Sequence, residues 1–269
     1  MTTAEKTDFV FEKIEVGPYI FYFDGNQKIT AGNGDFDSPE PNAFSLIQVQ
    51  DCPWSTPTCQ KTCYVHNLEK FQEAVHEQYR HNSAAIRHLL SRDEDDWGYY
   101  WETVQAFGAW ISTNAKGGFR WHVSGDIFSW QYAMFIADVC RDSPHVQHWI
   151  YTRSFPLLGP ILNIDNLTVN LSADKDNYWL ARKYAFEHDL RVCYLTVDGE
   201  VPDDLHSCDV IFPDYSLRGV GQRPFQFRQD SEFWQSLTST QRKLVCPVDQ
   251  YGKSEKVRCG PCSRCLGKR

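Results

Sequence analysis

The chain has 269 residues, of which 42% are hydrophobic and 14% aromatic, and its formal net charge at pH 7 is −8. This length and apolar content are enough for one large domain with a small appendage. The start, MTTAEKTDFVFEKIEV, lacks the apolar core of a signal peptide, and no run approaches the roughly 18 apolar residues of a membrane span. We therefore expect a cytoplasmic protein with no membrane partner.

Charge divides the chain into two parts. Residues 214–269 carry 11 Lys and Arg against 5 Asp and Glu, a net charge of +6, which leaves −14 for residues 1–213. The acidic sign overall excludes a general binder of polyanions, but a basic lobe can still hold a phosphate backbone locally. The alternative is a solvated tail that only improves solubility.

Apolar runs typical of strands alternate with amphipathic stretches typical of helices. In chain order the strands are expected at 44–50, 119–123, 147–152, 167–171, 191–197 and 208–212. The helices are expected at 67–90, with Asn67 as N-cap, and at 97–113, 129–141 and 176–188. This alternation predicts an α/β fold with a parallel sheet. Six strands favour a partial (β/α)6-type, TIM-like barrel at 1–213, followed by a small, basic, cysteine-rich metal-binding extension at 214–269.

Polar residues follow every expected strand. In a parallel sheet the loops after the carboxyl ends of the strands line the site. The candidates there are Cys52, Cys59 and Cys63; Ser124, Gly125 and Asp126; Thr152 and Arg153; Ser172, Ala173 and Asp174; Asp198; and Asp214. Each of these loops alone would be an ordinary turn. Their coincidence on one rim predicts a functional site.

The first of these loops, CPWSTPTCQKTCY, holds three cysteines within residues 52–63. Pro53 and Pro57 prevent the stretch from forming one continuous helix. Three thiolates without a fourth protein ligand suit a [4Fe–4S] cluster with one open iron, since soft sulfur ligands select iron–sulfur or zinc. A zinc site completed by His66 and plain buried cysteines remain the alternatives.

Four more cysteines occur in the tail, CPVDQYGKSEKVRCGPCSRC, at Cys246, Cys259, Cys262 and Cys265. Three thiols at successive x2 spacing with a remote fourth are closer to a ferredoxin-like [4Fe–4S] pattern than to the paired C-x2-C of structural zinc. A second cluster is therefore expected there, with zinc as the alternative. The remaining cysteines, at 140, 193 and 208, fall in a helix or strands and are expected in the core.

Several segments together resemble a phage family of uncharacterised proteins known as "gene product 88". They are the cysteine stretch, FRWHVSGDIFSWQYAMFIADVCRDSP, HWIYTRSF, LTVNLSADKD and the cysteine-rich tail, covering roughly residues 44–265. The resemblance implies a phage-encoded protein acting in the host cytoplasm. It implies no activity, because none is settled for that family.

A more distant resemblance is to the radical S-adenosylmethionine (radical SAM) superfamily, which carries three cysteines after the first strand of a partial barrel. Tyr64 lies beside the third cysteine, as an aromatic does there, although the x6 and x3 spacing departs from the superfamily's x3 and x2. The resemblance implies S-adenosyl-L-methionine as cofactor. Ser124, Gly125 and Asp126 would hold its amino group, and Ser172 matches a residue that contacts the ribose.

The candidate reaction groups are Asp126, His122, Arg153 and Asp174. Asp126 would accept from the ammonium of the cofactor, and Arg153 could pair with a carboxylate or phosphate. His122 is a candidate proton donor, with a core histidine as the alternative. The expected partners are a small-molecule or nucleotide substrate, an electron donor, and nucleic acid at the basic extension.

Three functions remain open on the sequence. The first is a radical-type iron–sulfur enzyme that modifies a nucleobase, nucleotide or nucleic acid. The second is a base-exchange enzyme resembling tRNA-guanine transglycosylase, in which Asp126 or Asp174 attacks the sugar and the tail binds structural zinc. The third is a non-enzymatic, metal-stabilised nucleic-acid-binding or assembly protein, which buried and satisfied rim aspartates would favour.

Overall fold

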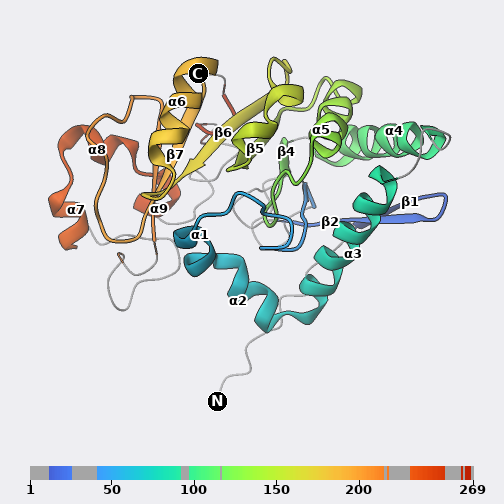
Figure 1. Cartoon of the computed structure of the whole chain (residues 1–269), viewed down its shortest axis with the longest axis horizontal. Helices are drawn as coiled ribbons and strands as arrows, with labels where there is room; N and C mark the ends of the chain where they lie inside the picture. Colours follow the sequence, from blue (N-terminus) through green and yellow to red (C-terminus); the bar gives the residue numbers. More distant parts are fainter. Residues whose placement is uncertain are drawn as a thin grey trace.

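The computed structural model describes residues 12–25, 41–91, 97–115, 117–214, 217, 231–251, 262 and 264–267. A six-stranded parallel sheet runs through the molecule with its strands in chain order (Figure 1). Its strands are β3 (Ala43–Phe44), β4 (Phe119–Trp121), β5 (His148–Thr152), β6 (Leu167–Ala173), β7 (Arg191–Thr196) and β8 (Val210–Pro213). The predicted α/β class is confirmed. Within the described chain, β3 and β8 are the two ends of an open sheet.

The first strand is much shorter than the predicted 44–50. After Phe44 the backbone still donates to the neighbouring strand's loop, from the Leu46 amide to the Ser124 carbonyl at 2.9 Å. It then leaves the sheet in a turn, where Val49 adopts a left-handed conformation with φ 63°. An alternating apolar pattern predicted a strand here, but the turn before Cys52 overrides it.

The helical stretch predicted at 67–90 is two helices. Helix α2 covers Tyr64–Phe71 and α3 covers Glu73–Leu90, and they separate at Gln72, whose φ of −134° and ψ of 85° are not helical. Asn67 therefore lies inside α2 and is not an N-cap. The other predicted helices are confirmed as α4 (Trp97–Asn114), α5 (Trp130–Asp142) and α6 (Tyr178–His188). None of the helices described has both the length and the apolar character needed to cross a membrane.

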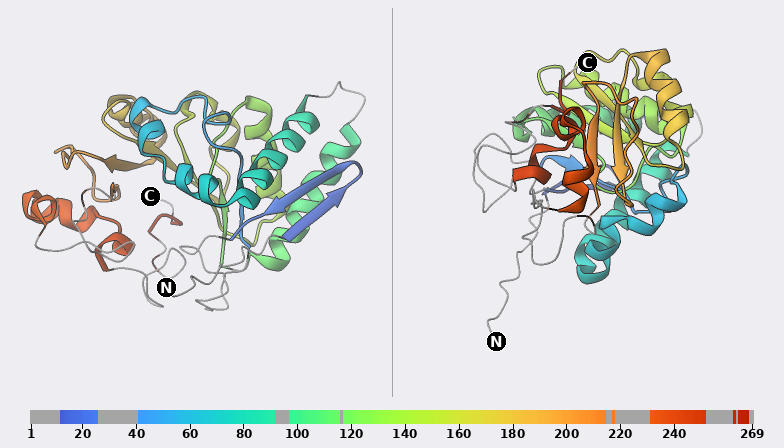
Figure 2. Two further views of the ribbon diagram at one scale, coloured as in Figure 1. Left: turned by 90° about the horizontal axis from the view of Figure 1, so that it is seen from below. Right: turned by 90° about the vertical axis from the view of Figure 1, so that its left-hand side faces the viewer.

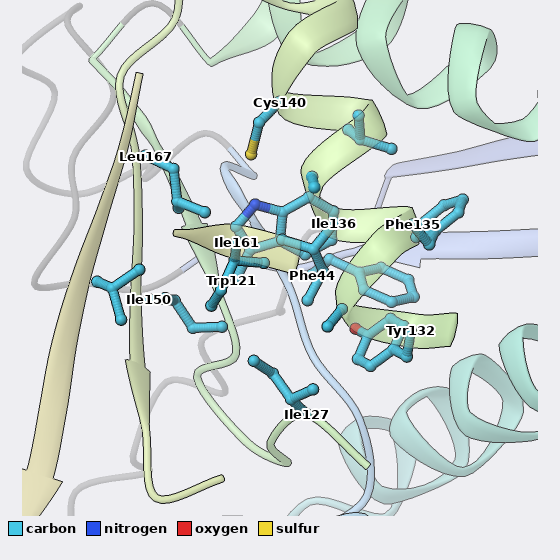
Figure 3. Close-up of a cluster of buried hydrophobic side chains, with 14 of the residues drawn as sticks. Phe44, Trp121, Ile127, Tyr132, Phe135, Ile136, Cys140, Ile150, Ile161 and Leu167 are labelled. Carbon is cyan, nitrogen blue, oxygen red and sulfur yellow. The ribbon is translucent and has the colours of Figure 1, made fainter. Parts of the chain in front are cut away.

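The main core lies between the sheet and helices α4, α5 and α6. Large aromatic side chains fill it, and Figure 3 shows Trp121 of β4 clustered with Phe44 of β3 and with side chains of α5. Trp121 is fully buried, and its ring is stacked on Phe107 of α4 at 6.4 Å between centroids. Burial of such rings supplies much of the hydrophobic stabilisation.

An N-terminal hairpin extends this core. Strands β1 (Glu12–Val16) and β2 (Tyr19–Phe23) pair antiparallel across a turn at Gly17, which has φ 54°. Phe23 is fully buried and stacks on Trp110 of α4, with 3.7 Å between ring centroids. The hairpin was not predicted, and it covers the β3 end of the sheet.

The C-terminal part packs against the β8 end of the sheet, on the face opposite α6 (Figure 2). It contains α7 (Glu232–Ser236), α8 (Ser239–Leu244) and α9 (Pro247–Tyr251). Val245 forms a parallel bridge with Ile211 of β8. Figure 2 (right) shows the sheet between α6 on one side and α7–α9 on the other.

Candidate functional site

The cysteine segment forms a short helix at the carboxyl ends of the strands. Helix α1 covers Pro57–Thr62, with Pro57 in the first turn, where proline is tolerated. Thr56 is the N-cap, and its Oγ1 accepts from the Cys59 amide at 3.0 Å. Cys59 is therefore helical, Cys63 is the residue that ends α1, and Cys52 lies in the turns before it. The prolines do keep the segment from being one helix.

This segment is fastened to the loop after β6. Thr56 Oγ1 donates to Asp174 Oδ2 at 2.5 Å, and the Thr58 amide donates to Asp176 Oδ2 at 2.9 Å. Its other end reaches the loop after β4, because the Tyr64 hydroxyl donates to the Val123 carbonyl at 2.6 Å. The three-cysteine segment thus bridges two strand ends of the parallel sheet.

The three thiols are half-buried and influence one another. Burial is the main cause that raises the pKa of Cys52, and the nearby Asp126, Cys59 and Cys63 raise it further. Burial also raises the pKa of Cys59, while the Arg153 guanidinium opposes that shift. Cys63 has its pKa raised by burial, and Arg153 again opposes the shift. The thiols therefore lie within electrostatic reach of each other and of one buried cation.

Asp126 connects three loops of the rim. Its Oδ1 accepts from Thr152 Oγ1 at 2.6 Å and from the Ile127 amide at 2.7 Å, and its Oδ2 accepts from the Arg153 amide at 2.8 Å. Its own amide donates to the carbonyl of Asp51, the residue before Cys52, at 2.8 Å. Burial raises the pKa of Asp126, and these hydrogen bonds oppose the shift.

Arg153 and Asp174, two of the predicted reaction groups, form a buried ion pair. Arg153 Nη2 lies 3.0 Å from Asp174 Oδ2, and the two side chains are 13% and 0% exposed. Asp174 Oδ1 accepts from the Asp176 amide at 3.0 Å. Both carboxylate oxygens of Asp174 are thus engaged, and the pair joins β5, β6 and α1.

Several polar atoms around this site are buried without a hydrogen-bond partner in the structure. They are the Oγ atoms of Ser124 and Ser154, Oδ2 of Asp51 and Nε of Arg153. Ser124 is only 4% exposed. Buried polar groups are nearly always satisfied in native proteins, so such a concentration calls for a ligand, ion or water.

Gly125 is required by a close approach of the backbone. Its φ is 83°, and a Cβ there would lie 2.6 Å from the Cβ of Leu46. The chain leaving β3 is thus the close neighbour of this glycine. Ser172 lies within β6, where its carbonyl accepts from Asn177 Nδ2 at 3.2 Å.

His122 lies in the core. Its Nε2 is 2.8 Å from the Tyr132 hydroxyl of α5, it is 2% exposed, and burial lowers its pKa to about 3. The imidazole is therefore neutral at neutral pH, which favours the core role that the sequence left open.

The tail cysteines lie apart from this rim. Cys246 is buried, Cys262 and Cys265 are half-buried, and Cys259 lies outside the described residues. Cys246 and Cys265 pack against Cys193 of β7, a contact that the sequence did not predict. Cys140 and Cys193 are buried as expected, whereas Cys208 is half-buried. Across the described ranges, no three His, Cys, Asp or Glu side chains are grouped so that they could hold a metal ion.

The fold and the rim define an α/β protein with three thiols at the carboxyl end of a parallel sheet. The chain belongs to the "Gene product 88" family, whose family model matches residues 20–267. It is 35% identical over 141 residues to the "Gene 88 protein" of Mycobacterium phage L5 and 34% identical over the same length to that of Mycobacterium phage D29. Each match covers 49% of this chain and 55% of the relative. No solved structure gave a significant match.

Proposed function

We propose that this protein is an iron–sulfur enzyme of the radical SAM type that modifies a nucleobase, a nucleotide or a nucleic acid. The observation that carries the proposal is the grouping of Cys52, Cys59 and Cys63 beside unpartnered buried polar atoms at the rim. A sheet with its strands in consecutive order supports a partial barrel around that rim. An electron donor would be a required partner.

A [4Fe–4S] cluster and a single zinc ion require different distances between the three thiols. Zinc holds its sulfur ligands at about 2.3 Å, which brings the sulfurs within roughly 4 Å of each other. The described cysteines do not gather around one such point, although they interact electrostatically. A [4Fe–4S] cluster binds each thiolate through a different iron, so the three sulfurs lie farther apart than the sulfur ligands of one zinc ion. His66, the fourth ligand of the zinc alternative, is exposed.

The neighbouring residues suit the polar end of S-adenosyl-L-methionine. Asp126 Oδ2 accepts a single hydrogen bond, and Ser124 Oγ accepts none, so both retain capacity for an ammonium group. Arg153 Nε is a free donor for a carboxylate. The bound cluster and cofactor would supply the radical chemistry, while these side chains bind, orient and exclude water.

The transglycosylase alternative requires a rim carboxylate that is free to attack a sugar. Asp174 is fully buried, and its oxygens are held by Thr56, Arg153 and the Asp176 amide. Asp126 is 7% exposed and accepts three hydrogen bonds. Neither carboxylate has the exposure of a nucleophile, which counts against this alternative.

The same burial favours a second candidate, a non-enzymatic protein in which metal stabilises the structure. Under this function the rim aspartates only fasten loops together, and the basic extension binds nucleic acid or a partner during assembly. Bound water would satisfy the unpartnered atoms of Ser124 and Arg153 under this function, whereas a cofactor would satisfy them under the first. A cofactor-binding measurement separates the two functions.

The test is anaerobic reconstitution of the full chain, with iron, sulfide and zinc analysis. Wild type is expected to bind about four irons at the rim, and about eight if the tail holds a second cluster. Cys59→Ser should lose about four irons. Cys208→Ser is the matched control, because Cys208 is also half-buried but lies away from the rim, and it should lose none. Equal iron in both variants would refute the rim cluster.

Calorimetry on the reconstituted protein then tests the cofactor. Asp126→Asn should weaken S-adenosyl-L-methionine binding by about 1.5–3 kcal/mol, the range for a hydrogen bond to a charged group, and should keep the iron. Asp203→Asn, at an exposed position outside the candidate site, is the control and should bind like wild type. A wild type with iron but without measurable cofactor binding would favour the structural-metal function.

A further inference from the structure

The described C-terminal segment, residues 264–267, lies along the face of the sheet opposite α6. Thr168 Oγ1 and Asn170 Nδ2 of β6 donate to the Leu266 and Cys265 carbonyls at 2.7 and 3.1 Å. Arg191 Nη2 of β7 donates to the Gly267 carbonyl at 3.4 Å. Leu266 packs on the buried Trp149 of β5. These contacts fix the position of this segment on three neighbouring strands.

This docking brings two distant cysteines into direct contact. Cys193 points from β7 to the face on which the segment lies, and Cys265 packs against it with Tyr151 beside the pair. The two thiols lie close enough to shift each other's pKa, and burial is the main cause that raises the pKa of Cys193. Cys193 is 3% exposed, whereas Cys265 is half-buried. A half-buried cysteine thus lies against a buried one.

Such a pair has the arrangement of an attacking and a resolving cysteine. A redox cysteine needs access to its oxidant and a second thiol close enough to trap the oxidised sulfur. Cys208 offers a contrast, because its Sγ is 3.8 Å from Asp209 Oδ1 and it is outside this cluster. Cys246 is buried in the same cluster and is the competing partner.

We propose that Cys193 and Cys265 are a peroxide-sensitive dithiol whose oxidation joins the C-terminal segment covalently to the sheet. The Cys265 sulfur attacks hydrogen peroxide, the O–O bond breaks, and one water leaves after proton uptake, giving a sulfenic acid. The Cys193 sulfur then attacks that sulfur, the S–O bond breaks, and a second water leaves. Peroxide gains two electrons, and the two thiols lose two electrons and two protons to form the disulfide.

This inference is independent of the function proposed for the rim, but it does compete with the prediction that Cys265 is a metal ligand of the tail. A thiolate bound to metal in the purified protein would be shielded from peroxide. The metal content of each sample is therefore measured alongside the thiols, and the full chain is used as purified.

The experiment treats the full chain with hydrogen peroxide, blocks the remaining thiols with N-ethylmaleimide, and maps tryptic peptides without reduction. Cys193 lies in peptide 192–218 and Cys265 in peptide 265–268, and a disulfide links the two. We expect this linked pair to become the main form of Cys265 in wild type. It should persist in Cys208→Ser, which removes the other cysteine of peptide 192–218, and in Cys246→Ser.

Cys193→Ser should abolish the linked pair. A Cys265 that remains alkylated by N-ethylmaleimide after peroxide, with or without bound metal, would overturn the proposal. So would a peptide that links Cys265 to Cys246 or Cys262, because the trapping thiol would then not be Cys193. Circular dichroism of the Cys193→Ser and Cys208→Ser variants verifies that both are folded.

Discussion

The rim around Cys59 and the docked tail around Cys265 are held in place by different kinds of contact. At the rim, buried charged groups are tied to each other and to α1 through side chains, as in Arg153, Asp174 and Thr56. In the tail, backbone carbonyls accept hydrogen bonds from the sheet, and one leucine packs on Trp149. The rim is therefore expected to be part of the cooperative fold, whereas the tail can undock locally.

The largest expected effect tests the rim. Asp174→Ala removes the partner of a buried arginine, and breaking a buried ion pair typically costs about 3–5 kcal/mol because a charge is left unpaired. Asp198→Ala breaks the exposed pair with Lys175 and should cost only about 0.2–1 kcal/mol. Urea unfolding of both variants measures the difference. Similar losses in the two would show that the Arg153–Asp174 pair contributes no more than a surface pair.

A second prediction concerns Asp24, a buried carboxylate that is linked through Ser45 to the loop after β4. Its Oδ2 accepts from Ser45 Oγ at 3.1 Å and from the Tyr79 hydroxyl at 3.0 Å, and Ser45 Oγ in turn accepts from the Val123 amide at 3.0 Å. Burial raises the pKa of Asp24 from 3.8 to about 6. Two hydroxyl groups hold this carboxylate, whereas Asp174 is held by one hydroxyl group and by the Arg153 guanidinium.

Because the folded pKa lies above the unfolded value, the native state binds the proton more tightly. The stabilisation that protonated Asp24 contributes is fully present below about pH 4. As the pH rises from about 4 to about 6, the free energy of unfolding falls by about 2–3 kcal/mol. Asp24→Asn should flatten that slope and raise the stability at pH 7. Urea unfolding at several pH values measures it, with exposed Asp203→Asn as the control that keeps the slope. An unchanged slope in Asp24→Asn would contradict the assignment.

The third prediction tests whether the tail docks independently. Leu266→Ala removes the side chain that packs on Trp149 and should weaken docking by about 2 kcal/mol, or about 30-fold in the docking equilibrium. Hydrogen exchange of residues 264–267 should accelerate by about that factor, with global unfolding little changed. Phe186→Ala, at a side chain of α6 that is 87% exposed, should change neither quantity. A matching loss of global stability would make the tail part of the cooperative fold.

The elements that were predicted from the sequence are those that a local apolar pattern determines. The six strands and the helices of the sheet region follow from apolar runs with clear periods, and the prolines around Cys59 correctly excluded a single long helix. The errors lie where a few residues override a pattern. Val49 turns the chain out of the first predicted strand, and Gln72 divides a predicted helix.

What the sequence could not predict depends on contacts between distant segments. The hairpin of β1 and β2 has an alternating apolar pattern around Gly17, which is a usable signal, although its docking on α4 is not a local property. The contact of Cys193 with Cys265 depends on how the tail lies on the sheet. Its only sequence signal is that Arg191 and Cys193 alternate with Val192, which would place both on one polar face of β7.

The smallest predicted effect tests how the rim positions α1. Thr56 caps α1 through the Cys59 amide and also donates to Asp174, so Thr56→Ala should cost about 1–2 kcal/mol. Thr56→Ser keeps a hydroxyl at the cap and should restore most of that loss. Thr113, whose hydroxyl donates to the Ala109 carbonyl on an exposed face of α4, is the matched control, and Thr113→Ala should stay within about 0.5 kcal/mol of wild type. Thermal unfolding of the three variants measures these differences in stability. If Thr56→Ala were as stable as Thr113→Ala, the position of Cys59 would not depend on this cap, and the bonds of Thr58 to Asp176 and of Tyr64 to Val123 would hold α1 at the rim.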